Sequence, residues 1–376
     1  MAQYDVIVIG LGAVGSAAAD HLARRGARVL GLEQFTPAHD RGSSHGETRI
    51  IRTAYFEDPA YVPLVQRAFE LWEDLERRSG RRLLTYTGAL MLGRPESEVV
   101  RGTLESARRW DLPHEELDAA AARRRFPAFA VPEDAVAVYE ERAGVVNPEL
   151  GVTAALDAAR EAGAELRFEE RVVGWDAGDA GVEVGTPEGR YRASRLVIAG
   201  GAWNPVLLEG LLPLQVERQV MHWFLPDGDI APYLPERMPV FLWERPDGAQ
   251  FYGFPALDGE AVKFCRHHGG ETTTADDVDR SIRPEDAARV EEARAVLLPG
   301  LKPSPARSKV CMYTNTPDLN FCLGLHPAFS RVAVAAGLSG HGFKFAPVLG
   351  EIMADLALDG GTRHPIEPFR LDRFAK

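Results

Sequence analysis

The sequence predicts a mixed α/β protein with two domains. One domain is a discontinuous α/β domain with a parallel sheet. The other is a mainly antiparallel sheet inserted into it, so that the whole chain is α+β. Three observations predict this. The 376 residues exceed what one simple core accommodates. Residues 4–33 show the order strand, helix, strand that is typical of a parallel sheet. Buried-strand patterns that end in glycine return at 195–201 and 331–337.

The parallel-sheet pattern therefore comes in three pieces, and we expect one domain to comprise residues 1–85, 145–215 and 310–376. Residues 86–144 and 216–309 mix short strands with a few helices and lack a glycine-rich nucleotide loop. We expect these two insertions to build the second domain, a sheet that covers the ligand.

A glycine-rich loop joins the first predicted strand to the first predicted helix. Gly10, Gly12 and Gly15 match G-x-G-x-x-G, in which the glycines permit a tight turn, close approach to a pyrophosphate and close packing of helix on strand. Glu33, at the end of the second strand, is placed to accept hydrogen bonds from a ribose 2′-hydroxyl. This Rossmann-like unit predicts a dinucleotide cofactor and leaves FAD and NAD equally open.

Charge and composition exclude several classes of partner. The net charge of −12 disfavours nucleic acid and anionic membranes, because the mean field repels polyanions. No apolar run is long enough to span a membrane, and the first ten residues have no basic segment. The three cysteines include no CxxC pair, which favours neither a disulfide framework nor a metal site. We expect a cytoplasmic enzyme without a metal.

Four further segments narrow the chemistry: GSSHGETRIIR at 42–52, YGFP at 252–255, CMYT at 311–314 and GLSGHGFK at 337–344. Together with the glycine loop they resemble the monomeric sarcosine oxidase and N-methyltryptophan oxidase family of FAD-dependent amine oxidoreductases, over residues 5–374. The resemblance implies a monomer with an FAD-binding domain and a substrate domain. It also implies that a secondary amino acid such as sarcosine gives a hydride to flavin N5, that the imine is hydrolysed, and that O2 is reduced to H2O2.

The resemblance further implies how FAD is held. Cys311 would form a thioether to the flavin 8α-methyl carbon, although a single cysteine is by itself more often a small buried hydrophobe. Val172 would lie near the adenine. The remaining cofactor contacts that the resemblance implies are Ser43, Gly340, Gly342 and Lys344.

Arg52 and Lys344 are the residues that, by the resemblance, bind the substrate carboxylate. A planar guanidinium pairs bidentately with a carboxylate and an ammonium adds a point charge. Arg49 would tune the flavin ring electrostatically, although two arginines three apart are also common on a surface. Tyr55 to Pro59 departs from the family pattern near the mouth of the expected pocket, so it bears on substrate size.

Lys263 resembles the lysine that activates oxygen, since a fixed cation in a dry pocket stabilises the charge that develops on O2. Lysine is rare here, with five against 38 arginines, and two of the five fall in the predicted site. The resemblance gives the remaining residues roles in pocket shape, hydrogen bonding and charge tuning: His45, Tyr252, His267 and Tyr313.

Several alternatives stay open. One is an N-methyl-L-tryptophan oxidase with a larger pocket. Another is a flavin dehydrogenase that passes electrons to a protein, against which Lys263 counts. A nicotinamide-dependent dehydrogenase would use the same glycine loop and would be colourless when purified. A non-catalytic flavin-binding module would leave the predicted carboxylate site without a purpose.

Overall fold

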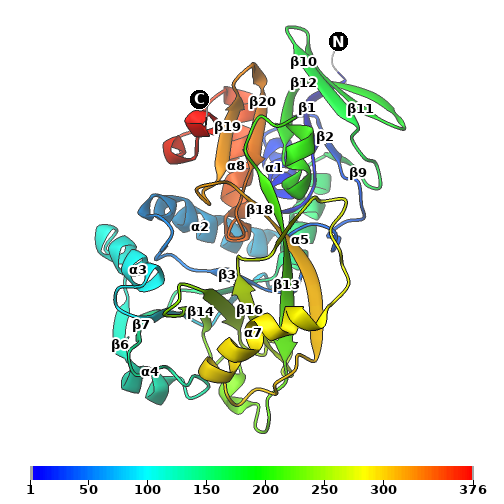
Figure 1. Cartoon of the computed structure of the whole chain (residues 1–376). Helices are drawn as coiled ribbons and strands as arrows, with labels where there is room; N and C mark the ends of the chain where they lie inside the picture. Colours follow the sequence, from blue (N-terminus) through cyan, green and yellow to red (C-terminus); the bar gives the residue numbers. More distant parts are fainter. Residues whose placement is uncertain (1–2, 375–376) are drawn as a thin grey trace.

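The computed structural model describes residues 3–374, and the mixed α/β fold is confirmed. Two large sheets form the two halves of the molecule (Figure 1), and the first and last described elements, β1 and the 3-10 helix Leu371–Phe374, lie on the half that contains the first sheet. None of the described helices is long and apolar enough to cross a membrane.

The first sheet is parallel at its centre, where four strands lie in the order β9, β2, β1 and β12, and β20 extends it from β12. β19 joins β20 in antiparallel orientation, and the hairpin of β10 and β11 pairs with the first half of β12. The bounds are β1 Tyr4–Ile9, β2 Val29–Leu32, β9 Glu165–Arg167, β10 Gly174–Gly178, β11 Gly181–Thr186, β12 Gly189–Ile198, β19 Cys322–His326 and β20 Phe329–Ala336.

Four helices cover one face of this sheet: α1 Ala13–Arg24, α2 Val62–Ser79, α5 Pro148–Glu161 and α8 Ala346–Asp359. The alanine-rich α1 allows α8 to approach very closely, since a Cβ on Gly350 would lie 2.5 Å from the Cβ of Ala17. The strand residues Val6 and Val8 are fully buried under these helices, and each contributes about 1.5–3 kcal/mol through burial. The tight packing fixes the carboxyl ends of the central strands, where the first glycine loop begins.

The second sheet has the order β17, β13, β16, β15, β14, β5, β7 and β6, with β18 also paired to β13. It is antiparallel except where β14 meets β5. The bounds are β5 Ala89–Gly93, β6 Glu115–Asp118, β7 Val136–Glu140, β13 Gln215–Phe224, β14 Val240–Glu244, β15 Gln250–Phe254, β16 Val262–His267, β17 Glu271–Thr273 and β18 Arg307–Asn315. β18 crosses the domain boundary predicted at residue 310 and pairs with β13 along its length.

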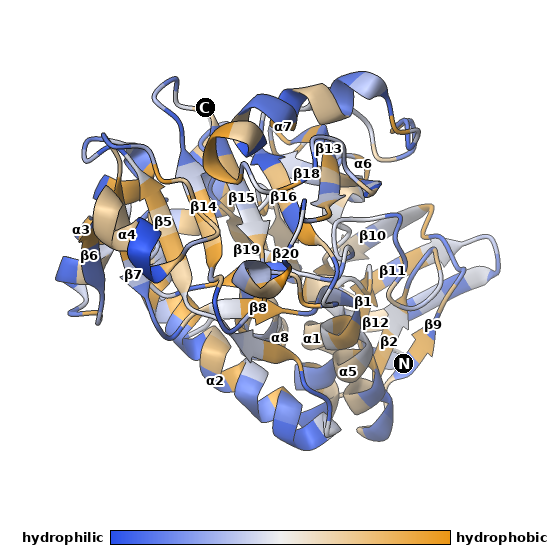
Figure 2. Ribbon diagram, turned by 90° about the horizontal axis from the view of Figure 1, so that it is seen from below, coloured by the Kyte–Doolittle hydropathy of each residue, from blue (hydrophilic) through white to orange (hydrophobic). Residues whose placement is uncertain are grey.

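Helices α4 Ala119–Arg125 and α7 Pro284–Leu297 pack on one side of the second sheet, and α3 Glu98–Arg109 packs near β5 and β14. Figure 2 shows hydrophilic residues along the outer helices α2 and α7, whereas the strands of both sheets are largely hydrophobic. Short elements complete the described chain: α6 Asn204–Leu207 and the 3-10 helices Pro59–Tyr61, Gly201–Trp203, Ala231–Tyr233, Phe343–Phe345, Glu367–Phe369 and Leu371–Phe374.

A small third sheet contains the segment with the predicted arginines. β8 Gly144–Val146 lies in its centre, with β3 Arg49–Ile51 on one side and β4 Leu84–Tyr86 on the other. β3 therefore begins at Arg49 and ends next to Arg52, and its position is set by its pairing with β8.

Candidate active site

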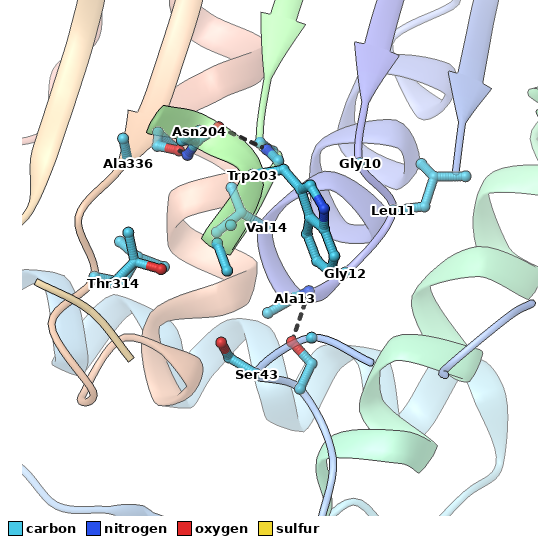
Figure 3. A pocket seen from close by; sticks show the side chains of 18 of the residues that line it. Gly10, Leu11, Gly12, Ala13, Val14, Ser43, Trp203, Asn204, Thr314 and Ala336 are labelled. Carbon is cyan, nitrogen blue, oxygen red and sulfur yellow. Dashed lines mark hydrogen bonds between the residues drawn. The ribbon is translucent and has the colours of Figure 1, made fainter. Parts of the chain in front are cut away.

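A long pocket begins at the carboxyl ends of β1, β2, β12 and β20 (Figure 3). Gly10 has a φ of +85°, and a Cβ there would lie 2.6 Å from the oxygen of Ala199. A Cβ on Gly15 would lie 1.7 Å from the oxygen of Gly10, so α1 can approach β1 only because Gly15 has no side chain. A Cβ on Gly12 would meet only the Ser44 hydroxyl, at 3.6 Å, which leaves room for a ligand. These three roles are those of a dinucleotide loop.

Glu33 lies at the wall of this pocket and is 6% exposed. Its Oε2 accepts a hydrogen bond from the amide of Leu11 at 2.9 Å, and its Oε1 accepts one from the amide of Phe35 at 3.1 Å. Each carboxylate oxygen has a second lone pair. The carboxylate therefore fixes the glycine loop and keeps acceptor capacity for hydroxyl groups in the pocket.

The other predicted cofactor contacts also line the pocket, with the exceptions of Cys311 and Lys344: Ser43, Val172, Gly340 and Gly342. The Ser43 hydroxyl donates to the carbonyl of Met312 at 2.7 Å, which ties the segment after the glycine loop to β18. Gly340 has a φ of +78°, and a Cβ there would meet the Tyr313 ring at 2.4 Å.

Asn204 is a residue of this pocket that the sequence analysis missed. It is fully buried; its Oδ1 accepts from the amide of Gly200 and its Nδ2 donates to the carbonyl of Ala335, both at 3.0 Å (Figure 3). The side chain thus joins the ends of β12 and β20. A polar residue directly after the largely apolar stretch LVIAGGAW at 196–203 was the available signal.

Five predicted residues from three strands lie on one face of the second sheet. Residues directly opposite in an antiparallel pair share a face, and so do residues two apart along a strand. The observed pairs are Trp223 with Lys263, Phe254 with Lys263, Tyr252 with Cys265, Gln219 with Cys311 and Glu217 with Tyr313. The common face therefore carries Tyr252, Lys263, His267, Cys311 and Tyr313, although sequence separates them by as many as 61 positions.

Lys263 extends from this face to the segment before β3. Its Nζ donates to the carbonyl of Gly46 at 2.9 Å and to the Thr48 hydroxyl at 3.2 Å. The centroids of the Trp223 and Phe254 rings lie 4.9 and 5.1 Å from Nζ. Burial, with a further contribution from Arg49, lowers the pKa of Lys263 to about 7. At neutral pH this amine can exchange a proton.

Arg49, the first residue of β3, lies beside Cys311 of β18. One guanidinium nitrogen donates to the carbonyl of Ser43 at 2.7 Å and lies 3.8 Å from the Cys311 sulfur. The other donates to the carbonyl of Thr48 at 2.7 Å. Cys311 is 2% exposed, and its neighbours Met312 and Tyr313 line the dinucleotide pocket. A guanidinium at this place is suited to stabilise negative charge on the sulfur.

His45 is 1% exposed, and neither ring nitrogen has a hydrogen-bond partner among residues 3–374. Burial, reinforced by Arg49, lowers its pKa to about 3, so the ring is neutral. Buried polar atoms normally have partners. The orphaned nitrogens, the glycine-lined pocket and Glu33 fit a bound dinucleotide that adds polar groups at this place.

Arg52 is buried, as expected for a substrate ligand, but it already has a carboxylate partner. Its Nη2 lies 2.6 Å from Oε2 of Glu57, and its Nη1 donates to the carbonyl of Ala54 at 2.8 Å. The guanidinium lies 4.3 Å from the centroid of the Tyr55 ring. Burial acts to raise the pKa of Glu57, but Arg52, followed by His341, holds that pKa below its usual value. Glu57 belongs to the segment expected near the pocket mouth, but its ion pair with Arg52 was not predicted.

Lys344 is the second cation of this cluster. Its Nζ donates to the Tyr55 hydroxyl at 3.1 Å and to the carbonyl of His341 at 2.7 Å. Burial, followed by repulsion from Arg52, lowers the pKa of Lys344 to about 7. The Tyr55 hydroxyl lies 2.7 Å from Nδ1 of His341, so one buried tyrosine connects the lysine to the glycine-rich segment.

Aromatic side chains from the second sheet face this cluster, since, besides burial, His341, Lys344 and Arg52 all act to lower the pKa of His267. Nδ1 of His267 lies 3.2 Å from the Tyr313 hydroxyl, and its ring meets that of Tyr252 edge-on, with centroids 5.9 Å apart. Burial, followed by repulsion from His268, holds the pKa of His267 well below its usual value. A neutral imidazole can accept or donate a hydrogen bond without adding charge to the pocket.

The comparisons with known proteins agree with this geometry. The family model of FAD dependent oxidoreductases matches residues 5–356. The monomeric sarcosine oxidase of Streptomyces avermitilis is 50% identical over 99% of this chain and 98% of its own length. The N-methyl-L-tryptophan oxidase of Salmonella enteritidis is 39% identical over the full length of both chains. The open form of NikD, an amino acid oxidase of nikkomycin biosynthesis, superposes with a TM-score of 0.86 at 28% identity, over 98% of both chains.

The relatives match along the whole chain, and the glycine loop, the pocket and the common face of the second sheet occur together in one structure. The nicotinamide alternative is therefore excluded, and the cofactor is FAD. The chain belongs to the family of FAD-dependent oxidoreductases, in the group that includes the monomeric sarcosine oxidases and the N-methyl-L-tryptophan oxidases.

Proposed function

We propose that the protein oxidises the N–C bond of N-methyl or other N-alkyl amino acids such as sarcosine, with O2 as the electron acceptor. The observation that carries the proposal is the cluster of Arg52 and Lys344, two buried cations held by Tyr55, Glu57 and His341. A small anion would neutralise such a cluster.

The substrate carboxylate would bind between Arg52 and Lys344 and replace Glu57 as the partner of the guanidinium. A bidentate ion pair in a desolvated site fixes both the position and the orientation of a small amino acid. The aromatic side chains of Tyr252, His267 and Tyr313 would then surround its N-alkyl group and exclude water. These contacts position the scissile C–H bond.

Bound FAD supplies the two-electron redox chemistry. Cys311 would hold it covalently through a thioether, and Arg49 would stabilise negative charge beside that sulfur. His45 would offer its unpartnered ring nitrogens to the cofactor. The backbone of Gly340 and Gly342 would approach without side chains. The chain contributes positions, dipoles and charges, and water hydrolyses the resulting imine to an amine and an aldehyde.

Lys263 would act in the second half of the reaction, the reduction of O2 to H2O2. Its ammonium lies between the rings of Trp223 and Phe254, in a desolvated site. A fixed cation in such a site stabilises negative charge far better than water does. A pKa near 7 allows the same amine to donate a proton and regain one. We further propose a cytoplasmic monomer.

A second candidate, an N-methyl-L-tryptophan oxidase, is favoured by one feature. An apolar cluster of Phe56, Met91, Val138 and Leu242 packs beside Tyr252. Tyr252, backed by this core cluster, would offer an apolar wall to a larger group on the substrate.

Peroxide production separates these candidates. The FAD-loaded protein would be supplied with sarcosine, N-methyl-L-tryptophan, N-benzylglycine or proline, and H2O2 would be compared with the amine formed. One peroxide per amine, with sarcosine as the best substrate, supports the proposal. A preference for N-methyl-L-tryptophan supports the second candidate. Substrate oxidation that needs an artificial acceptor and yields no peroxide would establish a dehydrogenase instead.

A further inference from the structure

Two glutamates that have no role in the proposed reaction hold the segment from Gly46 to Ala54 at its two ends. Oε1 of Glu149 accepts from the amides of Gly46 at 2.6 Å and Glu47 at 3.2 Å, and its Oε2 also accepts from Glu47 at 3.1 Å. At the other end, Glu140 accepts from the amides of Thr53 at 2.7 Å and Ala54 at 2.9 Å. We call Glu140 and Glu149 the anchoring carboxylates.

The antiparallel pairing of β3 with β8 explains why both anchoring carboxylates reach their targets. Arg49 is opposite Val146, and Ile51 is opposite Gly144. Glu140 is the last residue of β7, shortly before β8, and Glu149 lies in the first turn of α5, shortly after β8. Because β3 runs in the opposite direction, the residue that follows β8 meets the start of the segment and the residue that precedes β8 meets its end.

Glu149 and Lys263 bind the two sides of one peptide unit. The amide of Glu47 and the carbonyl of Gly46 belong to the same peptide unit, which is planar and points its N–H and C=O in opposite directions. Glu149 accepts from this N–H, and Lys263 donates to this C=O at 2.9 Å. Gly46 and Glu47 have φ values of +93° and +69°. Such a conformation costs about 1–2 kcal/mol at a non-glycine residue, so the peptide needs an outside contact to keep it.

Glu140 binds the backbone next to Arg52. It holds the two amides that directly follow Arg52, while the Arg52 side chain donates to the carbonyl of Ala54. Glu140 is 6% exposed. Burial raises the pKa of its carboxyl, although the two amides act against that change. The Thr53 side chain and the charge of Arg52 also lower this pKa, so the carboxyl faces the segment that it holds.

We propose that Glu149 and Glu140 are positioning residues, Glu149 for the amine of Lys263 and Glu140 for the guanidinium of Arg52. The roles of these two cations rest on the proposed function, but their positions do not. The segment from Gly46 to Ala54 thus contacts Lys263, the residue proposed to activate O2, at one end and contains Arg52, which would bind the substrate carboxylate, near the other. The two ends are set independently of each other.

The charges around Lys263 predict how its titration responds to Glu149. Besides burial, the cation Arg49 lowers the pKa of the Lys263 amine. Cys265, Cys311 and Glu149 act to raise that pKa. His45 lies close to the same amine. Replacement of Glu149 by glutamine removes a negative charge and presents an N–H to an amide that needs an acceptor. Both changes disfavour the ammonium form of Lys263.

The test uses the FAD-loaded protein labelled with 13Cε-lysine, because the chain has only five lysines and its spectrum therefore contains few resonances. Lys263→Met and Lys344→Met variants assign the two buried ones. Glu149→Gln is expected to lower the titration midpoint of Lys263 by about half a pH unit or more, and to leave that of Lys344 unchanged. Glu140→Gln is expected to leave Lys263 unchanged and to weaken the binding of propionate, followed through the visible flavin spectrum, by about fivefold.

Glu76→Gln is the matched control. Oε1 of Glu76 accepts from the amides of Leu83 and Leu84 at 2.8 and 3.3 Å. This contact is of the same kind, but it holds the backbone at the start of β4 instead of that around β3. This variant is expected to change neither measurement. If Glu149→Gln does not fold, Glu149→Asp keeps the charge but loses reach, and is expected to shift the Lys263 midpoint by a smaller amount in the same direction.

The proposal is overturned if Glu149→Gln leaves the Lys263 midpoint where it was, or if all three glutamine variants change both measurements equally. These readouts need no turnover. A protein that makes no peroxide from sarcosine would therefore refute the proposed function and leave the test of the anchoring carboxylates intact.

Discussion

Arg52 and Glu57 form a buried ion pair in which 2.6 Å separates Nη2 from Oε2. A substrate carboxylate that binds Arg52 must displace this internal carboxylate. The pair keeps the guanidinium neutralised while no anion is bound, and it lowers the apparent affinity for any external carboxylate.

Replacement of Glu57 by glutamine should therefore lower the KM for sarcosine. Loss of the competing charge is expected to lower it by about tenfold, which corresponds to about 1.4 kcal/mol. The melting temperature of the free variant should fall, because Arg52 then lacks a charged partner, and added propionate should restore it. Glu70→Gln, which breaks an ion pair of the partly exposed Arg67, is the control. A KM that rises in Glu57→Gln would show that Glu57 helps to bind the substrate.

Lys263→Met should separate the two halves of the reaction. Removal of one positioned charge from a dry site costs about a hundredfold in rate, so the second-order rate constant for O2 is expected to fall by about that factor. The anaerobic rate of reduction by substrate should change by less than about threefold, because the carboxylate cluster is intact. Stopped-flow measurements of each half-reaction test this. Equal losses in both would assign Lys263 to substrate binding.

The stability of the protein should depend on pH through Lys344. Burial, then Arg52, lowers its pKa to about 7, whereas an unfolded lysine titrates near 10.5. Because the folded state disfavours the ammonium form, the destabilisation is complete below pH 7 and disappears as the pH rises towards 10.5. Relative to Lys344→Met, the wild type should gain about 2.5 kcal/mol of unfolding free energy between pH 6.5 and 9. Urea unfolding of both proteins at each pH measures this, and a difference independent of pH would contradict it.

Cys311→Ala should release the flavin from the polypeptide. After acid precipitation, the wild type is expected to keep its yellow colour and in-gel flavin fluorescence, and the variant to lose both. Cys322→Ala, in the first sheet, removes another buried thiol and should keep the flavin attached. Colour that stays with Cys311→Ala would place the attachment elsewhere.

The glycine loop, Glu33 and the first β-α-β unit could be predicted from sequence because each depends on neighbours within 33 residues. The side of the second sheet that carries Lys263, Tyr252 and Cys311 could not, because strand register and pairing order decide it. The family resemblance supplied those residues instead.

Glu57, Glu140, Glu149 and Asn204 were missed for a related reason. Each acts through one to three hydrogen bonds to groups placed by tertiary structure. Nothing in the local sequence distinguishes the three glutamates from surface side chains, and for Asn204 the only signal is the stretch that precedes it. The boundary predicted at residue 310 divides β18 because the composition does not change there, while the hydrogen bonds to β13 continue through it.

The central claim is that Arg52 and Lys344 bind the carboxylate of a secondary amino acid. The most direct measurement compares kcat/KM for sarcosine with that for sarcosinamide, which has the same N-methyl group and no charge on the carboxyl carbon. The amide cannot replace Glu57 as the charged partner of Arg52 and gives Lys344 no anion, so the ratio is expected to be on the order of a thousandfold. In Arg52→Ala the ratio should fall to about tenfold. Equal kcat/KM values for the two compounds in the wild type would contradict the account.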